Sequence, residues 1–155
     1  MKIRIRKVTG YKCEYTITRD DGSEELIALE TKTFLVHDVC HYVVEKHLEY
    51  PNGFWGMLAQ GYSFKALFGK DNPQTEDLRF IEKIVGPVQS VYQGFIQRED
   101  LPGFIAHIDF AVPETILSSC IAEIEEIMRR WEQLPVGGQL QLEGEFGTMN
   151  SHQKA

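Results

Sequence analysis

Two histidines four residues apart are the feature of this sequence best suited to chemistry. His37 and His41 lie in the segment FLVHDVCHYVVEKHL, residues 34–48, which is the most apolar helix candidate in the chain. On a helix, a spacing of four places two side chains on one face, about 6 Å apart along the axis. Two imidazoles at this spacing can share one ion, so His37 and His41 are candidate ligands of a divalent metal, zinc or a similar ion.

The pentapeptide His-Asp-Val-Cys-His, residues 37–41, resembles the HExxH motif of the zincin metallohydrolases, with Asp38 where that family has glutamate. In the family, the two histidines bind zinc and the glutamate polarises the attacking water. The resemblance covers five residues of the 155. It implies that His37 and His41 bind metal, and that Asp38 is a general base or hydrogen-bonds a ligand. Aspartate is one methylene shorter than glutamate, so its reach toward a metal-bound water is shorter.

Glu45 lies one further turn along the same face and extends the pattern to His-x3-His-x3-Glu. Three ligands from one helix would strain the side chains, because His37 and Glu45 are about 12 Å apart along the axis. We therefore expect two adjacent members to bind the ion, either His37 with His41 or His41 with Glu45. The third member would hydrogen-bond a ligand or contact the substrate. Another segment must complete the site, and His107 or Asp109 would do so if their segment ran alongside this helix.

A polar stripe on an apolar helix has a second interpretation, which the sequence leaves open. Such a stripe is commonly the solvent-exposed face, and a His–Glu pair four residues apart contributes only modest stabilisation. The protein would then be a non-enzymatic ligand-binding or protein-interaction module rather than a metal-dependent hydrolase. Its aromatic segment, residues 54–68, would shape a small-molecule pocket or the surface of a homo-oligomer. Against this interpretation, the stripe holds two histidines, Asp38 and Glu45 but no lysine, whereas solvent-exposed faces are usually rich in lysine.

The segments on either side of this helix predict a small antiparallel sheet. Apolar and polar residues alternate over residues 2–8, 11–19 and 24–30, as they do in half-buried strands. The sequence Asp-Asp-Gly-Ser at residues 20–23 predicts a hairpin turn. Residues 139–143 alternate in the same way and can join the sheet as an edge strand. We therefore expect an α+β fold, in which a three-stranded N-terminal meander and a C-terminal strand pack against about three main helices.

Three segments have the apolar spacing of amphipathic helices: residues 34–48, about 73–97, and 113–133. The first should be the most buried, with Thr31 or Thr33 as its N-cap. The last contains acidic residues early and arginines late, as the helix dipole favours. We therefore expect the charged side of this helix to be a solvent-exposed face and not a functional site.

Prolines and glycines mark the limits of the remaining elements. Asn72 and Pro73 suit the N-cap and first turn of the second helix, and Gly86-Pro87 predicts a kink or break within it. Residues 54–68 predict one or two short helical turns packed against the central helix. These turns would form either the wall of a pocket or an aromatic plug of the core, with core packing favoured. Residues 101–110 fit a short buried strand and a helical turn equally well.

Length, charge and cysteine content limit the functional classes. A chain of 155 residues with 43% hydrophobic residues predicts a single domain over residues 1–146, followed by a flexible tail over residues 147–155. The net charge of −7 argues against nucleic-acid binding, which needs a basic surface. Three cysteines without a CxxC motif indicate free thiols in a reducing compartment. No segment resembles a membrane span or a signal peptide, so the expected location is the cytoplasm.

Overall fold

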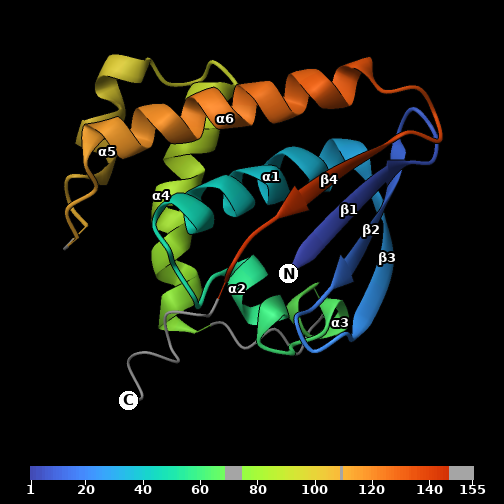
Figure 1. Ribbon diagram of the computed structural model, residues 1–155. Helices are drawn as coiled ribbons and strands as arrows, with labels where there is room; N and C mark the ends of the chain where they lie inside the picture. The colour runs from blue at the N-terminus through green and yellow to red at the C-terminus, as the bar shows by residue number, and fades with distance from the viewer. Residues whose placement is uncertain (69–74, 109, 147–155) are drawn as a thin grey trace.

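Four segments of alternating apolar and polar residues form one antiparallel sheet with the strand order β3-β2-β1-β4 (Figure 1). The computed structural model describes residues 1–68, 75–108 and 110–146, so the predicted tail at 147–155 lies outside the described residues. The strands are β1 (Lys2–Lys7), β2 (Lys12–Thr18), β3 (Glu24–Glu30) and β4 (Gln139–Glu143). The predicted meander is confirmed, and the C-terminal strand joins it beside β1, at the edge opposite β3. The fold is α+β with a small sheet.

The strand register turns one apolar face of the sheet toward the helices. Ile5 of β1 lies opposite Tyr15 of β2, and both side chains are buried. The neighbouring pair, Ile3 and Ile17, is buried on the same face. Strand β4 adds two buried leucines, which lie opposite Ile3 and Ile5 of β1. The intervening positions are mostly polar and more exposed, so one face of the sheet belongs to the core and the other is polar.

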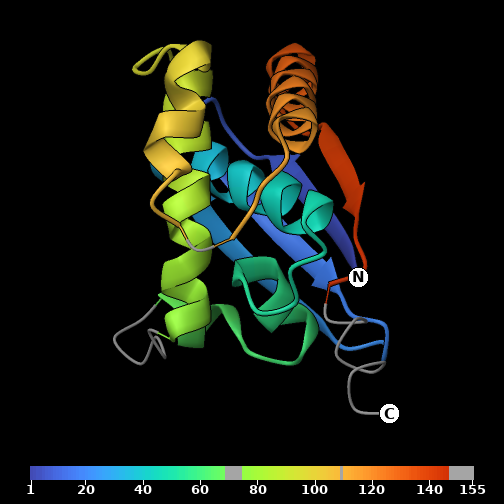
Figure 2. The same cartoon turned by 90° about the vertical axis from the view of Figure 1, so that its left-hand side faces the viewer.

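Three long helices pack on the apolar side of the sheet, α1 (Thr31–His47), α4 (Glu76–Tyr92) and α6 (Glu114–Gln133). Helix α1 contacts β3, α4 and α6, and Figure 2 shows it in front of the sheet, between the two other long helices. The short helical elements are α2 (Phe54–Ala59), α3 (Phe64–Phe68), η1 (Arg98–Asp100) and α5 (Leu101–Ile105). Nine of the 17 residues of α1 are buried, against four of 17 in α4 and seven of 20 in α6, so the central helix is the most buried, as predicted.

Strand β3 runs directly into α1, which corrects the predicted start of this helix. The helix begins at Thr31 with Glu30 in the N-cap position, and no side chain caps it. The predicted cap at Thr31 or Thr33 is therefore wrong, because both threonines lie inside the first turn. The first N–H groups of a helix have no partner within it. The N–H of Thr31 donates instead to the carbonyl of Tyr11, in the loop between β1 and β2, at 2.9 Å.

Helix α4 starts later than the sequence predicts. Thr75 caps it, and the side-chain oxygen of Thr75 accepts a hydrogen bond from the N–H of Leu78 at 3.1 Å. The predicted start at Pro73 is therefore wrong, because Thr75, two residues later, is the N-cap and has an extended backbone. Asn72 and Pro73 themselves lie outside the described residues.

Helix α4 also continues through its proline, so of the kink or break predicted at Gly86-Pro87, the break does not occur. Val85 and Val88, on either side, are fully buried, and their packing holds both halves of the helix against the same core. The helix ends at Tyr92, earlier than predicted, because Gly94 has a positive φ of 85° and turns the chain away.

Both segments between the long helices contain short helices. Residues 54–68 form α2 and α3, as predicted, and residues 101–110 begin with α5, so the helical alternative is the one observed there. Leu101 and Ile105 bury the apolar side of α5. Across the described ranges, no helix combines the length and the apolar character that a crossing of the bilayer requires.

Candidate functional site

His41, in the middle of α1, is the centre of the site and is only 2% exposed. Its two ring nitrogens face two carboxylates: Nδ1 is 2.9 Å from Oε2 of Glu45, and Nε2 is 2.7 Å from Oε1 of Glu82. Because carboxylate oxygens accept hydrogen bonds, both nitrogens donate and the ring carries a positive charge. Burial alone would lower the pKa of His41, but the hydrogen bonds to Glu45 and Glu82 raise this pKa to about 10.

Glu45 connects His41 to the helix that follows it. Its carboxylate is fully buried and accepts hydrogen bonds from the backbone N–H groups of Phe54, Trp55 and Gly56, at 2.7, 3.0 and 3.1 Å. These are the first N–H groups of α2, so Glu45 caps that helix from α1. With the bond from His41, both oxygens are fully engaged. Glu45 thus lies beside the candidate metal ligands and orients one of them.

Gly53 makes this close approach sterically feasible. A Cβ atom at residue 53 would lie 2.2 Å from Cδ of Glu45, far inside van der Waals contact. Only glycine allows the chain before α2 to pass over the carboxylate. Gly53 is therefore also part of the site.

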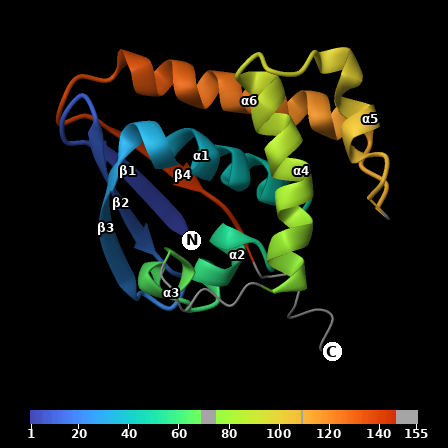
Figure 3. The ribbon, with the colours of Figure 1, turned by 180° about the vertical axis from the view of Figure 1, so that it is seen from behind.

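Glu82 is a candidate site residue that the sequence did not reveal. It comes from α4, which runs across α1 (Figure 3), and its Oε1 lies 2.7 Å from Nε2 of His41 and 3.4 Å from Nε2 of His37. Burial would raise the pKa of Glu82, but hydrogen bonds with the two histidines hold this pKa well below its usual range. In the sequence Glu82 is an ordinary charged residue on the polar side of an amphipathic helix, so no local pattern distinguishes it.

His37 completes a group with His41 and Glu82. Its Nδ1 lies 2.8 Å from Oε1 of Gln89, and its ring meets that of His41 edge-on, with centroids 4.7 Å apart. The hydrogen bond to Glu82 is the main cause that raises the pKa of His37 above its usual value. Gln89 holds Nδ1, so the other nitrogen, Nε2, remains directed at Glu82.

His37, His41 and Glu82 have the spacing that one ion requires. One ligand atom from each lies within 4.8 Å of the others, and they form the one such group of His, Cys, Asp and Glu residues found in the described ranges. A tetrahedral ion with bonds of about 2.1 Å separates its ligand atoms by about 3.4 Å. The Nε2 of His37 is already 3.4 Å from Glu82, and the contact between His41 and Glu82, at 2.7 Å, would open by less than an ångström. Two imidazoles and one carboxylate are an established ligand set of catalytic zinc and iron sites.

Asp38 lies beside this group and lines the same pocket. Its Oδ2 accepts a hydrogen bond from the hydroxyl of Tyr15 at 2.7 Å, and its backbone carbonyl accepts one from Nε1 of Trp55 at 2.8 Å. Burial raises the pKa of Asp38 to about 6, and the Tyr15 hydroxyl opposes this by stabilising the carboxylate. A carboxyl group with a pKa near neutrality can both accept and return a proton under physiological conditions.

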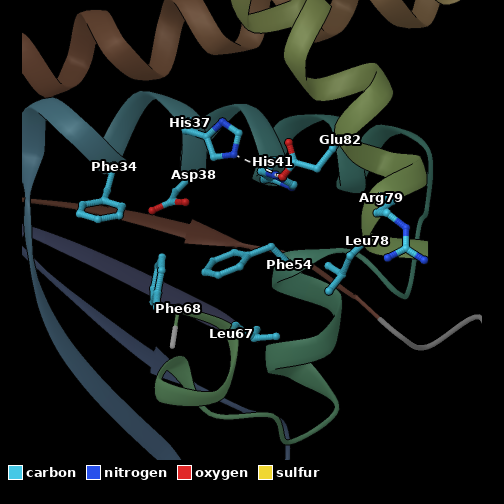
Figure 4. Close-up of a pocket in the computed structure, with 10 residues that line it drawn as sticks. All are labelled: Phe34, His37, Asp38, His41, Phe54, Leu67, Phe68, Leu78, Arg79 and Glu82. Carbon is cyan, nitrogen blue, oxygen red and sulfur yellow. Dashed lines mark hydrogen bonds and ion pairs between the residues drawn. The ribbon is translucent and has the colours of Figure 1, made fainter. Parts of the chain in front are cut away.

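These polar groups open into a pocket of about 290 Å³ (Figure 4). His37, Asp38, His41 and Glu82 lie along one side. The rest of the lining consists of Arg79 and five apolar side chains, which are Phe34, Phe54, Leu67, Phe68 and Leu78.

Segment 54–68 serves both of its predicted roles. Phe54, Leu67 and Phe68 line the pocket, whereas Trp55, Leu58 and Phe64 are buried in the core. The buried guanidinium of Arg19, just after β2, donates to the carbonyls of Leu58 and Tyr62 and so ties α2 and the loop that follows it to the sheet.

The other candidate residues lie outside the group. His107 is exposed in the turn after α5, and Asp109 lies outside the described residues. His47 points to Glu123, with Nε2 at 2.8 Å from the carboxylate. The three cysteines are buried and form no disulfide.

Comparison with models of protein families, with curated proteins and with solved structures finds no match. The function proposed for the site is therefore argued from its own residues and their geometry.

Proposed function

We propose that this protein binds a divalent transition metal, zinc or a similar ion, through His37, His41 and Glu82, and that it uses this ion in hydrolysis. The observation that carries the proposal is the convergence of two imidazole nitrogens and one carboxylate oxygen at the side of a pocket. Three protein ligands leave a position for water, which is the arrangement of catalytic rather than structural zinc sites. The ion would supply a bound water of lowered pKa.

The surrounding residues then have distinct roles. Glu45 accepts the Nδ1 proton of His41 and so presents Nε2 to the ion, as carboxylates commonly do behind metal-binding histidines. Gln89 does the same for His37. Asp38 is the general base, which accepts a proton from the water, and Tyr15 holds its carboxylate in place.

The first experiment is metal analysis of protein purified without an affinity tag. Wild type should contain close to one equivalent of zinc, manganese, iron or nickel, and the double variant His37→Ala/His41→Ala should contain none while its circular dichroism shows a folded protein. His47→Ala is the matched control, because it removes a histidine from the same helix outside the group and should keep the metal. Absence of metal from wild type, even after incubation with excess ion, would refute the proposal.

A second candidate function has its own support. Both nitrogens of His41 and both oxygens of Glu45 are satisfied by hydrogen bonds within the protein, so the network is complete without an ion. The protein would then be a non-enzymatic module that binds a small molecule in the pocket beside a charged imidazolium. Protein that takes up no metal but still binds small apolar acids would favour this function.

We further propose that the protein acts in the cytoplasm. The support is that Cys13, Cys40 and Cys120 are all buried and unpaired, as expected of thiols in a reducing compartment. Fractionation of the producing cells, followed by detection of the native protein, tests this location.

A further inference from the structure

The apolar part of the pocket lining is mostly aromatic. Phe34, Phe54 and Phe68 come from three different helices and pack together, with the ring of Phe68 centred 5.6 Å from that of Phe34 and 5.2 Å from that of Phe54. Leu67 and Leu78 extend this wall. Phe34, Phe68 and Leu78 are only partly buried by the protein itself, so they still offer apolar surface to a ligand.

Four of the five polar residues of the lining lie together along one side, and the fifth, Arg79, lies away from them beside Leu78. In Figure 4, His37, Asp38 and Glu82 approach the pocket from α1 and α4, whereas Phe54, Leu67 and Phe68 face them from α2 and α3. A ligand that lies between these four residues and the phenylalanines therefore carries its polar atoms mainly at one end. A sugar or a nucleotide, with polar atoms around its whole surface, would leave many of them without hydrogen bonds against this wall.

The volume limits the size of the ligand. At about 290 Å³, the pocket is at the lower end of the range for small-molecule sites. It has room for one ring and a short chain.

We propose that the pocket binds a compact aromatic acyl group, and that the substrate is a small carboxylic ester or amide of an acid with one aromatic ring. This proposal rests on the metal-dependent hydrolase function proposed above. The carbonyl end would face His37, His41 and Glu82, and the ring would lie among the phenylalanines. In the reaction, a water oxygen bonds to the carbonyl carbon as the bond to the alcohol oxygen or amide nitrogen breaks. One proton of the water passes through Asp38 to the leaving group.

Hydroxamates test this ligand class without any need for turnover, because they bind metals directly. The protein is loaded with Co²⁺, whose visible absorption reports on coordination, and titrated with 3-phenylpropanohydroxamate and with acetohydroxamate. We expect the aromatic compound to bind at least about tenfold more tightly, because its ring is buried against apolar surface. Phe68→Ala and, separately, Leu78→Ala should remove this preference while the affinity for acetohydroxamate stays the same.

Phe95→Ala is the matched control, because Phe95 is 80% exposed and lies outside the pocket lining. It should keep the preference. Equal binding of the two hydroxamates by Co²⁺-loaded wild type, or a preference that survives both pocket variants in folded protein, would overturn the proposal.

A metal-free arm separates failure of this proposal from failure of the metal site. If Co²⁺ produces no absorption band, the proposed function has failed, and 3-phenylpropanoate and propanoate are compared by NMR on metal-free protein. Shifts of the Leu67 and Leu78 methyl signals with the aromatic acid alone would support the aromatic pocket. No shift with either acid would refute it.

Discussion

The carboxylate of Glu45 accepts a hydrogen bond from Nδ1 of His41 at 2.9 Å, with both side chains buried in α1. The same oxygen accepts the N–H of Phe54 at 2.7 Å. One buried group therefore orients a candidate metal ligand and holds the start of the helix that forms the pocket wall. A substitution that disturbs the start of α2 should therefore alter the orientation of His41, and a substitution near His41 should affect the start of α2.

Replacement of Glu45 by glutamine should weaken both metal binding and the fold. An amide presents an NH₂ group to donors, so at least one of the four hydrogen bonds is lost. We expect zinc affinity to fall by about 10- to 100-fold, as for other groups that orient metal-binding histidines. Stability should fall by about 2–4 kcal/mol. Zinc competition with a chelator and urea unfolding measure the two effects. Glu125→Gln, on the exposed face of α6, is the control and should change neither.

Gly53→Ala should act through the same carboxylate. Its Cβ would lie 2.2 Å from Cδ of Glu45, so either the chain before α2 or Glu45 must move. We expect a loss of about 1–3 kcal/mol in stability, together with weaker zinc binding. Gly103→Ala is the control, since a Cβ there meets nothing within 4 Å and α5 should gain about 0.5–1 kcal/mol. Equal effects of the two changes would show that the approach of Gly53 to Glu45 is not tight.

The charge on His41 should make the stability of the metal-free protein depend on pH. The pKa of His41 is about 10 in the folded protein, against an ordinary 6.5. Its contribution is therefore fully present below pH 6.5 and is lost as the pH rises through 10. We expect wild type to exceed His41→Asn by about 3 kcal/mol at pH 6, with a difference that shrinks by pH 10. Urea unfolding across this range measures it. His47→Asn should stay within about 1 kcal/mol of wild type throughout, and a constant gap for His41→Asn would contradict the assignment.

Metal binding should release a proton. An ion at Nε2 of His41 replaces the proton that this nitrogen donates to Glu82. Apparent zinc affinity should therefore rise by about tenfold for each pH unit between pH 6 and 8, well below the pKa of about 10. Competition with a chelator, corrected for titration of the chelator, gives this slope. An affinity that does not change with pH would show that the ion binds without displacing a proton from His41.

Asp38→Asn should abolish proton transfer and leave the metal in place. We expect kcat on an ester of 3-phenylpropanoic acid to fall by about 10²- to 10⁴-fold with unchanged zinc content. In Tyr15→Phe, loss of the hydroxyl that stabilises the carboxylate should raise the pKa of Asp38 above about 6. The acidic limb of kcat/KM should then move to higher pH. A variant that loses stability without any shift of this limb would show that Tyr15 and Asp38 are structural only.

Much of the architecture could be predicted from local patterns. Alternation with a period of two located the strands, and apolar spacing located the three long helices. The same spacing placed His37, His41 and Glu45 on one face of α1, because positions four apart on a helix are neighbours whatever surrounds it. Most errors fall at helix ends, where a backbone contact with Tyr11 or a cap at Thr75 decided the boundary. The expected break at Gly86-Pro87, in the middle of α4, does not occur because core packing holds the helix together there.

The sequence by itself therefore determined which side chains of α1 share a face, and which segments are strands and helices. Only the tertiary structure decided what those side chains meet. Glu82 lies 41 positions from His41 in the chain, and its place in the site depends on how α4 crosses α1. The carboxylate of Glu45 accepts hydrogen bonds from the start of α2 because the turn at Gly53 brings that helix close to Glu45. Local periodicity reflects the geometry of single elements, whereas contacts between elements follow from the packing of the whole core.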